Sequence, residues 1–130
     1  MPIGGLHDMT HAEPDVLAAE LREAGWKVFV LPRGISDRES FFRGVREVAP
    51  LDPPVLGDRK WDALSDSLWN GLDSLDEGRI AIIWPESTTL ARVAPDDFIV
   101  AQDILAKIAV SLGSVTATVN EPKEVFVGLA

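Results

Sequence analysis

Two apolar runs that each stop at a proline constrain the fold more than any other feature of this 130-residue chain. Residues 27–32 read Lys-Val-Phe-Val-Leu-Pro, and residues 79–85 read Arg-Ile-Ala-Ile-Ile-Trp-Pro. Uninterrupted short runs rich in β-branched side chains are typical of strands covered on both faces. Because helices on both sides of a sheet cover strands in this way, the sequence predicts an α/β fold.

Amphipathic helices are predicted around these two strands. They span residues 15–24 behind Pro14, 36–49 behind a capping box of Ser36 and Glu39, 58–75, and 95–112. Further strand candidates lie at 114–119 and 124–129. This order predicts a small, mainly parallel sheet of three or four strands with helices packed over it and an extra N-terminal helix. Residues 1–13 are polar and contain glycine, so we expect a flexible leader before a single domain at 14–130.

The charge balance limits the choice of partner. The chain has 21 acidic and 12 basic residues, a formal net charge of −9, and no cysteine. A surface of this sign repels phosphate backbones and anionic lipid and attracts basic proteins, so neither nucleic acid nor a membrane is expected as a partner. The N-terminus lacks a secretion signal and no window is apolar enough to span a membrane, so we expect a cytoplasmic protein, monomeric when free.

Catalysis and metal binding find little support in the sequence. The histidines, His7 and His11, are four residues apart, a spacing that could place two metal ligands on one helix face. They lie in the polar leader without a third ligand nearby, so no metal and no cofactor is expected. Motifs that position a nucleophile or a phosphate are also absent from the sequence.

The predicted helix at 58–75 has an unusual charge pattern. At 100° per residue, Trp61 falls with the leucines of the apolar stripe, whereas Asp58, Asp62, Asp66 and Asp73 share another arc of about 80°. Like charges one turn apart destabilise a helix, which suggests a role outside folding. Trp69 lies within the acidic arc and Ser65 at its edge. Two interpretations stay open: Trp69 is an interface anchor, or it folds back onto the last helix of an ordinary solvated face.

The run at 59–68, Arg-Lys-Trp-Asp-Ala-Leu-Ser-Asp-Ser-Leu, resembles the R-N-[WL]-D-A-L-x-D-C-L type motif of the barstar family, the intracellular inhibitors of barnase-type ribonucleases. The order of elements is similar over residues 26–112, and the additional helix before the first strand resembles the longer, actinobacterial-type members. The resemblance implies that Asp62 and Asp66 are inhibitory carboxylates. It further implies that Asp66 enters the ribonuclease active site in place of a substrate phosphate.

The chain departs from the family motif at several positions. Ser65 stands where the family often has an aromatic residue, and Leu56 or Gly57 replaces the aromatic residue that commonly precedes the motif. Lys60 replaces a frequent Asn and puts a cation beside a site meant for a basic enzyme. These changes suggest a different partner, for which Trp69 supplies the missing apolar anchor.

Three functions are therefore compared. The first is inhibition of a basic ribonuclease or related toxin through the face of Asp62, Asp66, Ser65 and Trp69. The neighbouring residues Leu56, Asp58, Lys60 and Trp61 are also expected to contact this partner. The second is an interaction or immunity module of the same fold that binds another basic protein. The third, a hydrolase with Asp62 and Asp66 as acid and base, is disfavoured because exposed carboxylates on a convex helix lack the environment that shifts a pKa. We expect Phe29, Phe41, Phe98 and Phe126 in the core, with Trp61 and Trp84 at its margin.

Overall fold

A computed structural model describes residues 4–57, 59–114 and 122–130 and confirms an α/β fold. Its sheet is parallel throughout, with the strand order β1-β4-β3-β2 in the described part of the chain. In register, Lys27 of β2 lies opposite Ile80, and Arg79 of β3 lies opposite Glu124. The strands are β1 (Gly5–Asp8), β2 (Lys27–Val30), β3 (Arg79–Trp84) and β4 (Glu124–Leu129).

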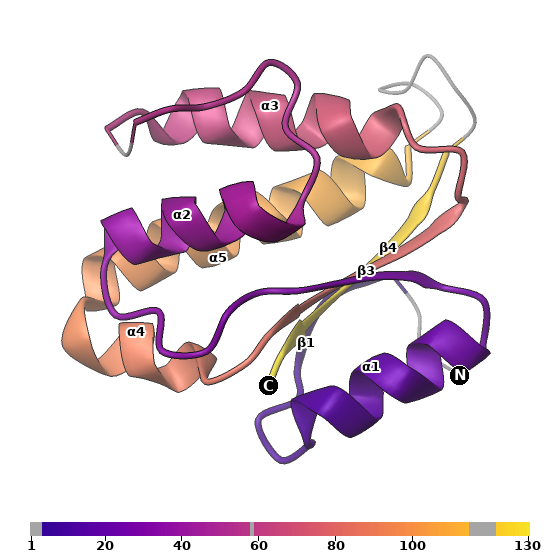
Figure 1. The fold of residues 1–130 in the computed structure, drawn as a ribbon, viewed down its shortest axis with the longest axis horizontal. Coiled ribbons are helices and arrows are strands. Elements are labelled where there is room, and N and C mark those ends of the chain that lie inside the picture. Colours follow the sequence, from indigo (N-terminus) through magenta and orange to yellow (C-terminus); the bar gives the residue numbers. More distant parts are fainter. Residues whose placement is uncertain (1–3, 58, 115–121) are drawn as a thin grey trace.

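Helices cover both faces of the sheet unequally (Figure 1). One face carries α1 alone, and the other carries α2, α3 and α5, whereas the short α4 follows β3 and leads into α5. The helices are α1 (Pro14–Glu23), α2 (Arg38–Val48), α3 (Trp61–Asp73), α4 (Ser87–Val93) and α5 (Pro95–Leu112).

The alternation of side chains along β3 divides the core in two. Ile80, Ile82 and Trp84 belong to the larger cluster under α2, α3 and α5, whereas Ala81 and Ile83 belong to the smaller cluster under α1. Both sets are at most 2% exposed, as the uninterrupted apolar run predicts for a strand covered on both faces. This core fixes the position of α3, which buries its leucines on the sheet side.

Several local expectations need correction. Within the predicted leader, residues 5–8 form β1, which is paired with β4 as an edge strand. The capping box of α2 uses Asp37 and Ser40 in place of Ser36 and Glu39. The strand β1 is short and depends on pairing with β4, which a single-sequence pattern does not report, whereas the capping box is local and starts one residue later than predicted.

Two further differences concern the last residue of β3 and the segment that follows it. Trp84 is fully buried between Phe41 and Phe98, with ring centroids at 5.0 and 5.5 Å, and is not at the core margin. The residues after Pro85 form α4, for which the sequence analysis has no counterpart. The strand candidate at 114–119 lies almost wholly outside the described residues.

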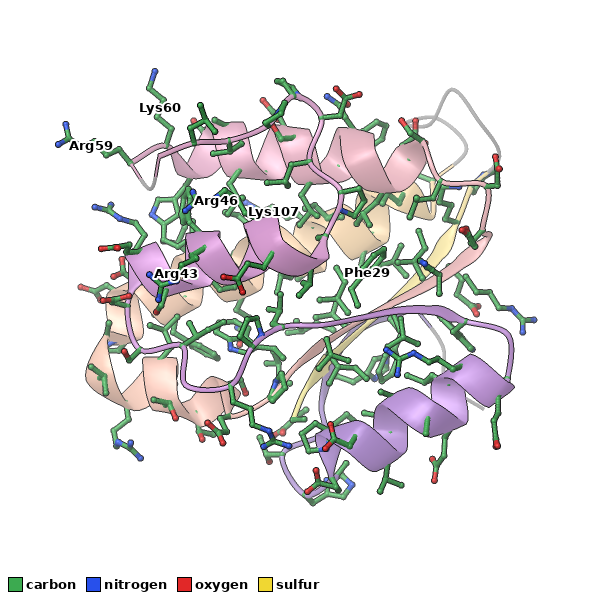
Figure 2. All side chains as sticks on the ribbon, viewed as in Figure 1. Phe29, Arg43, Arg46, Arg59, Lys60 and Lys107 are labelled. Atoms are coloured by element: carbon green, nitrogen blue, oxygen red, sulfur yellow. The ribbon has the colours of Figure 1, made fainter. Side chains whose placement is uncertain are left out.

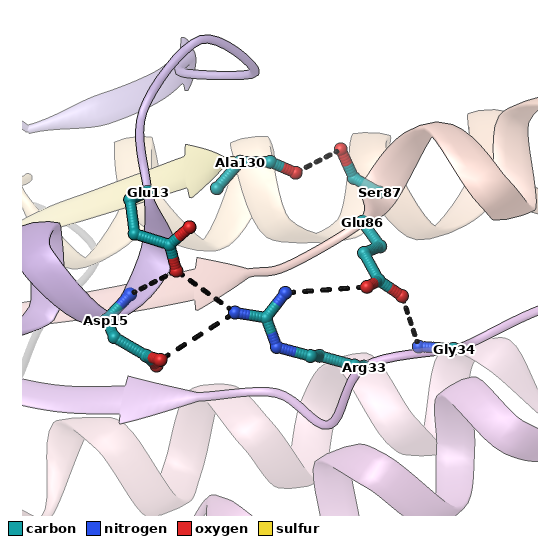
Figure 3. A network of polar contacts seen from close by, with 7 residues as sticks. All are labelled: Glu13, Asp15, Arg33, Gly34, Glu86, Ser87 and Ala130. Atoms are coloured by element: carbon teal, nitrogen blue, oxygen red, sulfur yellow. Dashed lines mark hydrogen bonds and ion pairs between the residues drawn. The ribbon is translucent and has the colours of Figure 1, made fainter.

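A polar network ties together the carboxyl ends of β2 and β3 (Figure 3). Arg33 donates to Glu86 and Glu13 and also pairs with Asp15 at 3.8 Å. The pKa of Arg33 is raised, mainly because its side chain is hydrogen-bonded to the Glu86 carboxylate. Glu86 has a left-handed backbone (φ 55°), and its Oε1 accepts the Gly34 N–H at 3.1 Å. Since these ion pairs are about half exposed, the network orders the loops more than it stabilises the fold.

Candidate functional site

Helix α3 separates a buried side from an exposed acidic side. Leu64, Leu68 and Leu72 are at most 1% exposed and anchor the helix in the larger core. Asp62 and Asp66 are both exposed, four residues apart on one side of the helix. We call this pair the acidic ridge. A rigidly held helix therefore presents two carboxylates to solvent.

The acidic ridge is shorter than the sequence pattern predicts. Asp73 is 9% exposed and is thus excluded from the solvated face, while Asp58 lies outside the described residues. Near the end of α3 the buried Lys123 donates from Nζ to the carbonyl oxygens of Leu75 and Glu77. This end of the helix is consequently occupied by internal contacts.

Trp69 packs inward onto the last helix. Its Nε1 donates to Ser111 Oγ of α5 at 3.0 Å, and the residue is half-buried against the larger core. Of the two interpretations given above, the structure supports the second, in which Trp69 folds back onto the last helix. Ser65 is also half-buried.

On its other flank, α3 is contacted by the segment that follows α2. We call this segment, residues 50–57, the connector. The Asp52 N–H donates to Ser67 O at 3.1 Å, and Asn70 Nδ2 donates to Asp52 O at 3.2 Å. Gly71 permits this approach, because a Cβ there would lie 2.0 Å from the carbonyl oxygen of Pro50. Glycine at this position of the helix is therefore a packing requirement.

Arg46 of α2 holds the outer part of the connector. Its Nη1 donates to Val55 O at 3.4 Å and to Gly57 O at 3.2 Å. Between these two residues Leu56 is 89% exposed. The connector and α3 enclose a groove of about 410 Å³. We call it the connector groove; its lining is Pro53, Pro54, Val55, Leu56, Gly57, Arg59, Lys60, Ala63 and Ser67.

A second hollow, of about 400 Å³, adjoins the start of α3. Its lining comprises Arg59, Lys60, Trp61, Asp62 and Ala63, so both cations and one carboxylate of the acidic ridge border the same space. Figure 2 shows Arg59 and Lys60 projecting outward at this end of the helix. Asp66 is not part of this lining, so this hollow does not bring both carboxylates together as a hydrolase would require.

Trp61 forms the floor of this region. It is half-buried, and its ring packs on Phe42 and Phe41 of α2 with centroid distances of 4.9 and 6.0 Å. The ring therefore fixes the first turn of α3 against α2. The sequence analysis places Trp61 at the core margin, where the structure also has it.

The structure brings together four of the predicted site residues at the two adjoining hollows. Leu56 lines the connector groove, Trp61 and Asp62 line the second hollow, and Lys60 lines both, whereas Ser65 and Asp66 lie farther along α3, outside both linings. The sequence analysis missed Arg46 and Gly71 as supports of this surface. Arg46 follows the apolar stripe of α2, so its reach to the connector could not be read from periodicity. Gly71, four residues after Ser67 on the same helix face, offered a signal that a chain segment approaches closely.

The positions of the two histidines do not fit the hypothesis that they bind a metal from one helix face. His7 lies in β1 and stacks on Phe126 at 5.0 Å, whereas His11 follows the strand, so the two do not share a helix face. Across the described residues no group of three or more His, Cys, Asp or Glu side chains is arranged to hold a metal. In this same portion of the chain, none of the helices combines the length and the apolar character needed to cross a membrane.

Fold and site together define a small α/β protein that presents an acidic helix on a rigid core. A family model described as Barstar (barnase inhibitor) matches residues 26–127. The chain therefore belongs to the barstar family, whose members are inhibitors and not enzymes. Comparisons with curated proteins and with solved structures gave no match.

Proposed function

We propose that this protein inhibits a basic, barnase-type ribonuclease by placing the acidic ridge of α3 in the enzyme's active-site cleft. The observation that carries the proposal is the pair Asp62 and Asp66. Their spacing resembles that of the two aspartates of the family motif, and both are exposed on the same side of one helix. A carboxylate on a convex ridge can stand in for a substrate phosphate. It offers two anionic oxygens to arginine, lysine or protonated histidine, which then form short charge-assisted hydrogen bonds.

The scaffold supports this role because it needs little rearrangement. Leu64 and Leu68 hold α3 against the sheet, and the Trp69 to Ser111 hydrogen bond ties it to α5. On binding, it is mainly the aspartate side chains that lose conformational entropy. This loss is small because they have few rotatable bonds. The ridge is thus pre-organised for a complementary cleft.

Charge supports fast association with a basic partner. The formal net charge of −9 produces a field that attracts a cationic enzyme over about 10 Å at 0.1 M salt. We therefore expect the association rate to fall steeply as salt is added, while the dissociation rate changes less. The proposed partner is a secreted ribonuclease or related toxin, and the proposed site of action is the cytoplasm.

The test is inhibition of RNA cleavage by barnase and other guanyl-specific bacterial ribonucleases, with the wild-type protein and the variant Asp66→Asn. Loss of one member of a buried, hydrogen-bonded charge pair costs about 2 to 5 kcal/mol, so inhibition should weaken by roughly 30-fold or more. Glu20→Gln, an exposed carboxylate on α1, is the matched control and should inhibit like the wild type. Equal inhibition by Asp66→Asn and the wild type would remove the proposed role of the ridge.

A second candidate is an interaction or immunity module that binds a basic protein without nuclease activity. Lys60 and Ser65 favour it, because they place a cation and a small polar residue where the family has Asn and an aromatic side chain. Isolation of a stoichiometric partner from the native cytoplasm that cleaves no RNA would favour this second function.

A further inference from the structure

Two exposed cations, Arg59 and Lys60, border the acidic ridge directly. Both line the hollow that contains Asp62, and both also line the connector groove on the other side. They therefore form a positive wall between a carboxylate and an apolar groove. Neither side chain is within ion-pair distance of any described carboxylate.

The Lys60 side chain does not cap the helix that it begins. Lys60 is the N-cap of α3 and makes no side-chain capping hydrogen bond. Asn, Asp or Ser at an N-cap satisfies a free backbone N–H of the first turn, and cations near a helix N-terminus are disfavoured by the helix dipole. Lys60 is thus unfavourable for its own helix and exposed to solvent, which points to an external contact.

The connector groove supplies the other half of that contact. Pro53, Pro54 and Leu56 give it apolar walls, and Leu56 is almost completely exposed beside it. Arg46 fixes the connector through two backbone carbonyls, so the groove has a defined shape before any partner binds. Prolines and a pinned loop lower the entropy lost on docking.

The order along this surface is a carboxylate, a pair of cations and an apolar groove. We propose that Arg59 and Lys60 determine partner specificity: the partner is a ribonuclease with a carboxylate on the rim of its cationic cleft and an apolar side chain next to that carboxylate. The carboxylate pairs with Arg59 and Lys60 while the apolar side chain enters the connector groove. This inference rests on the proposed function. A basic ribonuclease without that carboxylate binds less tightly, because its cationic rim then faces the two cations unpaired.

The proposal is tested by whether a charge reversal at Arg59 and Lys60 weakens or strengthens binding. The variant Arg59→Glu/Lys60→Glu makes the protein more acidic by four charges, which by long-range attraction alone would speed association with any basic enzyme. We expect the opposite: at least tenfold weaker binding to ribonucleases that carry the rim carboxylate. Arg22→Glu/Lys27→Glu makes the same charge change at exposed positions on α1 and β2 and should bind as the wild type does, or slightly faster.

The experiment measures dissociation constants by calorimetry for a panel of barnase and related guanyl-specific ribonucleases, grouped by the presence of a carboxylate at the cleft rim. The wild type should bind the carboxylate group at least tenfold more tightly. Leu56→Ala should weaken binding to that group several-fold, and thermal unfolding verifies that each variant is folded.

The outcomes separate the two proposals. If Asp66→Asn weakens binding but Arg59→Glu/Lys60→Glu binds every enzyme as tightly as the wild type, the specificity inference is wrong and the proposed function stands. If the wild type binds none of the ribonucleases, the proposed function fails and the inference fails with it.

Discussion

Gly71 offers a direct test of how the connector is held against α3. An alanine Cβ at this position would lie 2.0 Å from Pro50 O and 2.6 Å from Pro50 C, and both of these atoms belong to the backbone. No side-chain rotation can relieve such a contact, so the connector must move by about 1 Å or more. The hydrogen bonds from Asp52 N to Ser67 O and from Asn70 to Asp52 O then lengthen or break.

The expected magnitude combines opposing effects. In an open helix interior, Gly→Ala stabilises by up to about 1 kcal/mol. Here two hydrogen bonds at about 1 kcal/mol each are weakened, and an overpacked contact adds about 1 to 3 kcal/mol. The free energy of unfolding of Gly71→Ala should therefore fall by about 2 to 4 kcal/mol.

Urea denaturation followed by tryptophan fluorescence and circular dichroism measures this change. Gly78→Ala is the control, since its added Cβ would meet nothing within 4 Å and its unfolding free energy should change by about 0.5 kcal/mol or less. A Gly71→Ala protein as stable as the wild type would refute the close packing of the connector on α3.

Substitutions at two other positions test the N-cap of α2 and the contacts of the segment that follows α3. The Ser40 side chain and backbone hydrogen bonds lower the pKa of Asp37, so the stabilisation from this N-cap is present above the ordinary carboxyl pKa of 3.8 and is lost as pH falls through the lower native value. Asp37→Ala should cost about 1 kcal/mol at pH 7 and progressively less below pH 3.8, whereas Asp37→Asn should stay near wild type, as measured by urea titrations over pH. Lys123→Met removes the Nζ that donates to the carbonyl oxygens of Leu75 and Glu77, and it should lower the unfolding free energy by about 2 kcal/mol. An unchanged midpoint would contradict a stabilising role of these two hydrogen bonds.

Much of the architecture follows from periodicity. The uninterrupted run of β3 predicts a strand covered on both faces, and the stripe of α5 predicts a long helix from Pro95 to Leu112; the structure confirms both. These elements are long or strongly apolar, so burial dominates their conformation. By contrast, β1 is a four-residue edge strand whose existence depends on pairing with β4, and no local pattern encodes that partner.

The site was predictable only in part. Spacing alone placed Asp62 and Asp66 on one helix side, and both are exposed. It also placed Asp73 there, but Asp73 lies near the end of α3, where neighbouring segments cover it. For Trp69, the helical wheel gave a direction within the acidic arc, whereas its long side chain reaches back to Ser111 on α5. A wheel reports the direction of Cβ, and the reach of a large side chain depends on the neighbouring helix.

The most direct test of phosphate mimicry is competition at the enzyme's active site. The binding of this protein to a barnase-type ribonuclease is titrated at increasing concentrations of a 3′-mononucleotide that occupies the phosphate subsite. If Asp66 replaces a substrate phosphate, the apparent dissociation constant rises in proportion to the nucleotide concentration, and the two ligands never bind together. Binding that is indifferent to the nucleotide, with a ternary complex in solution, would contradict the account.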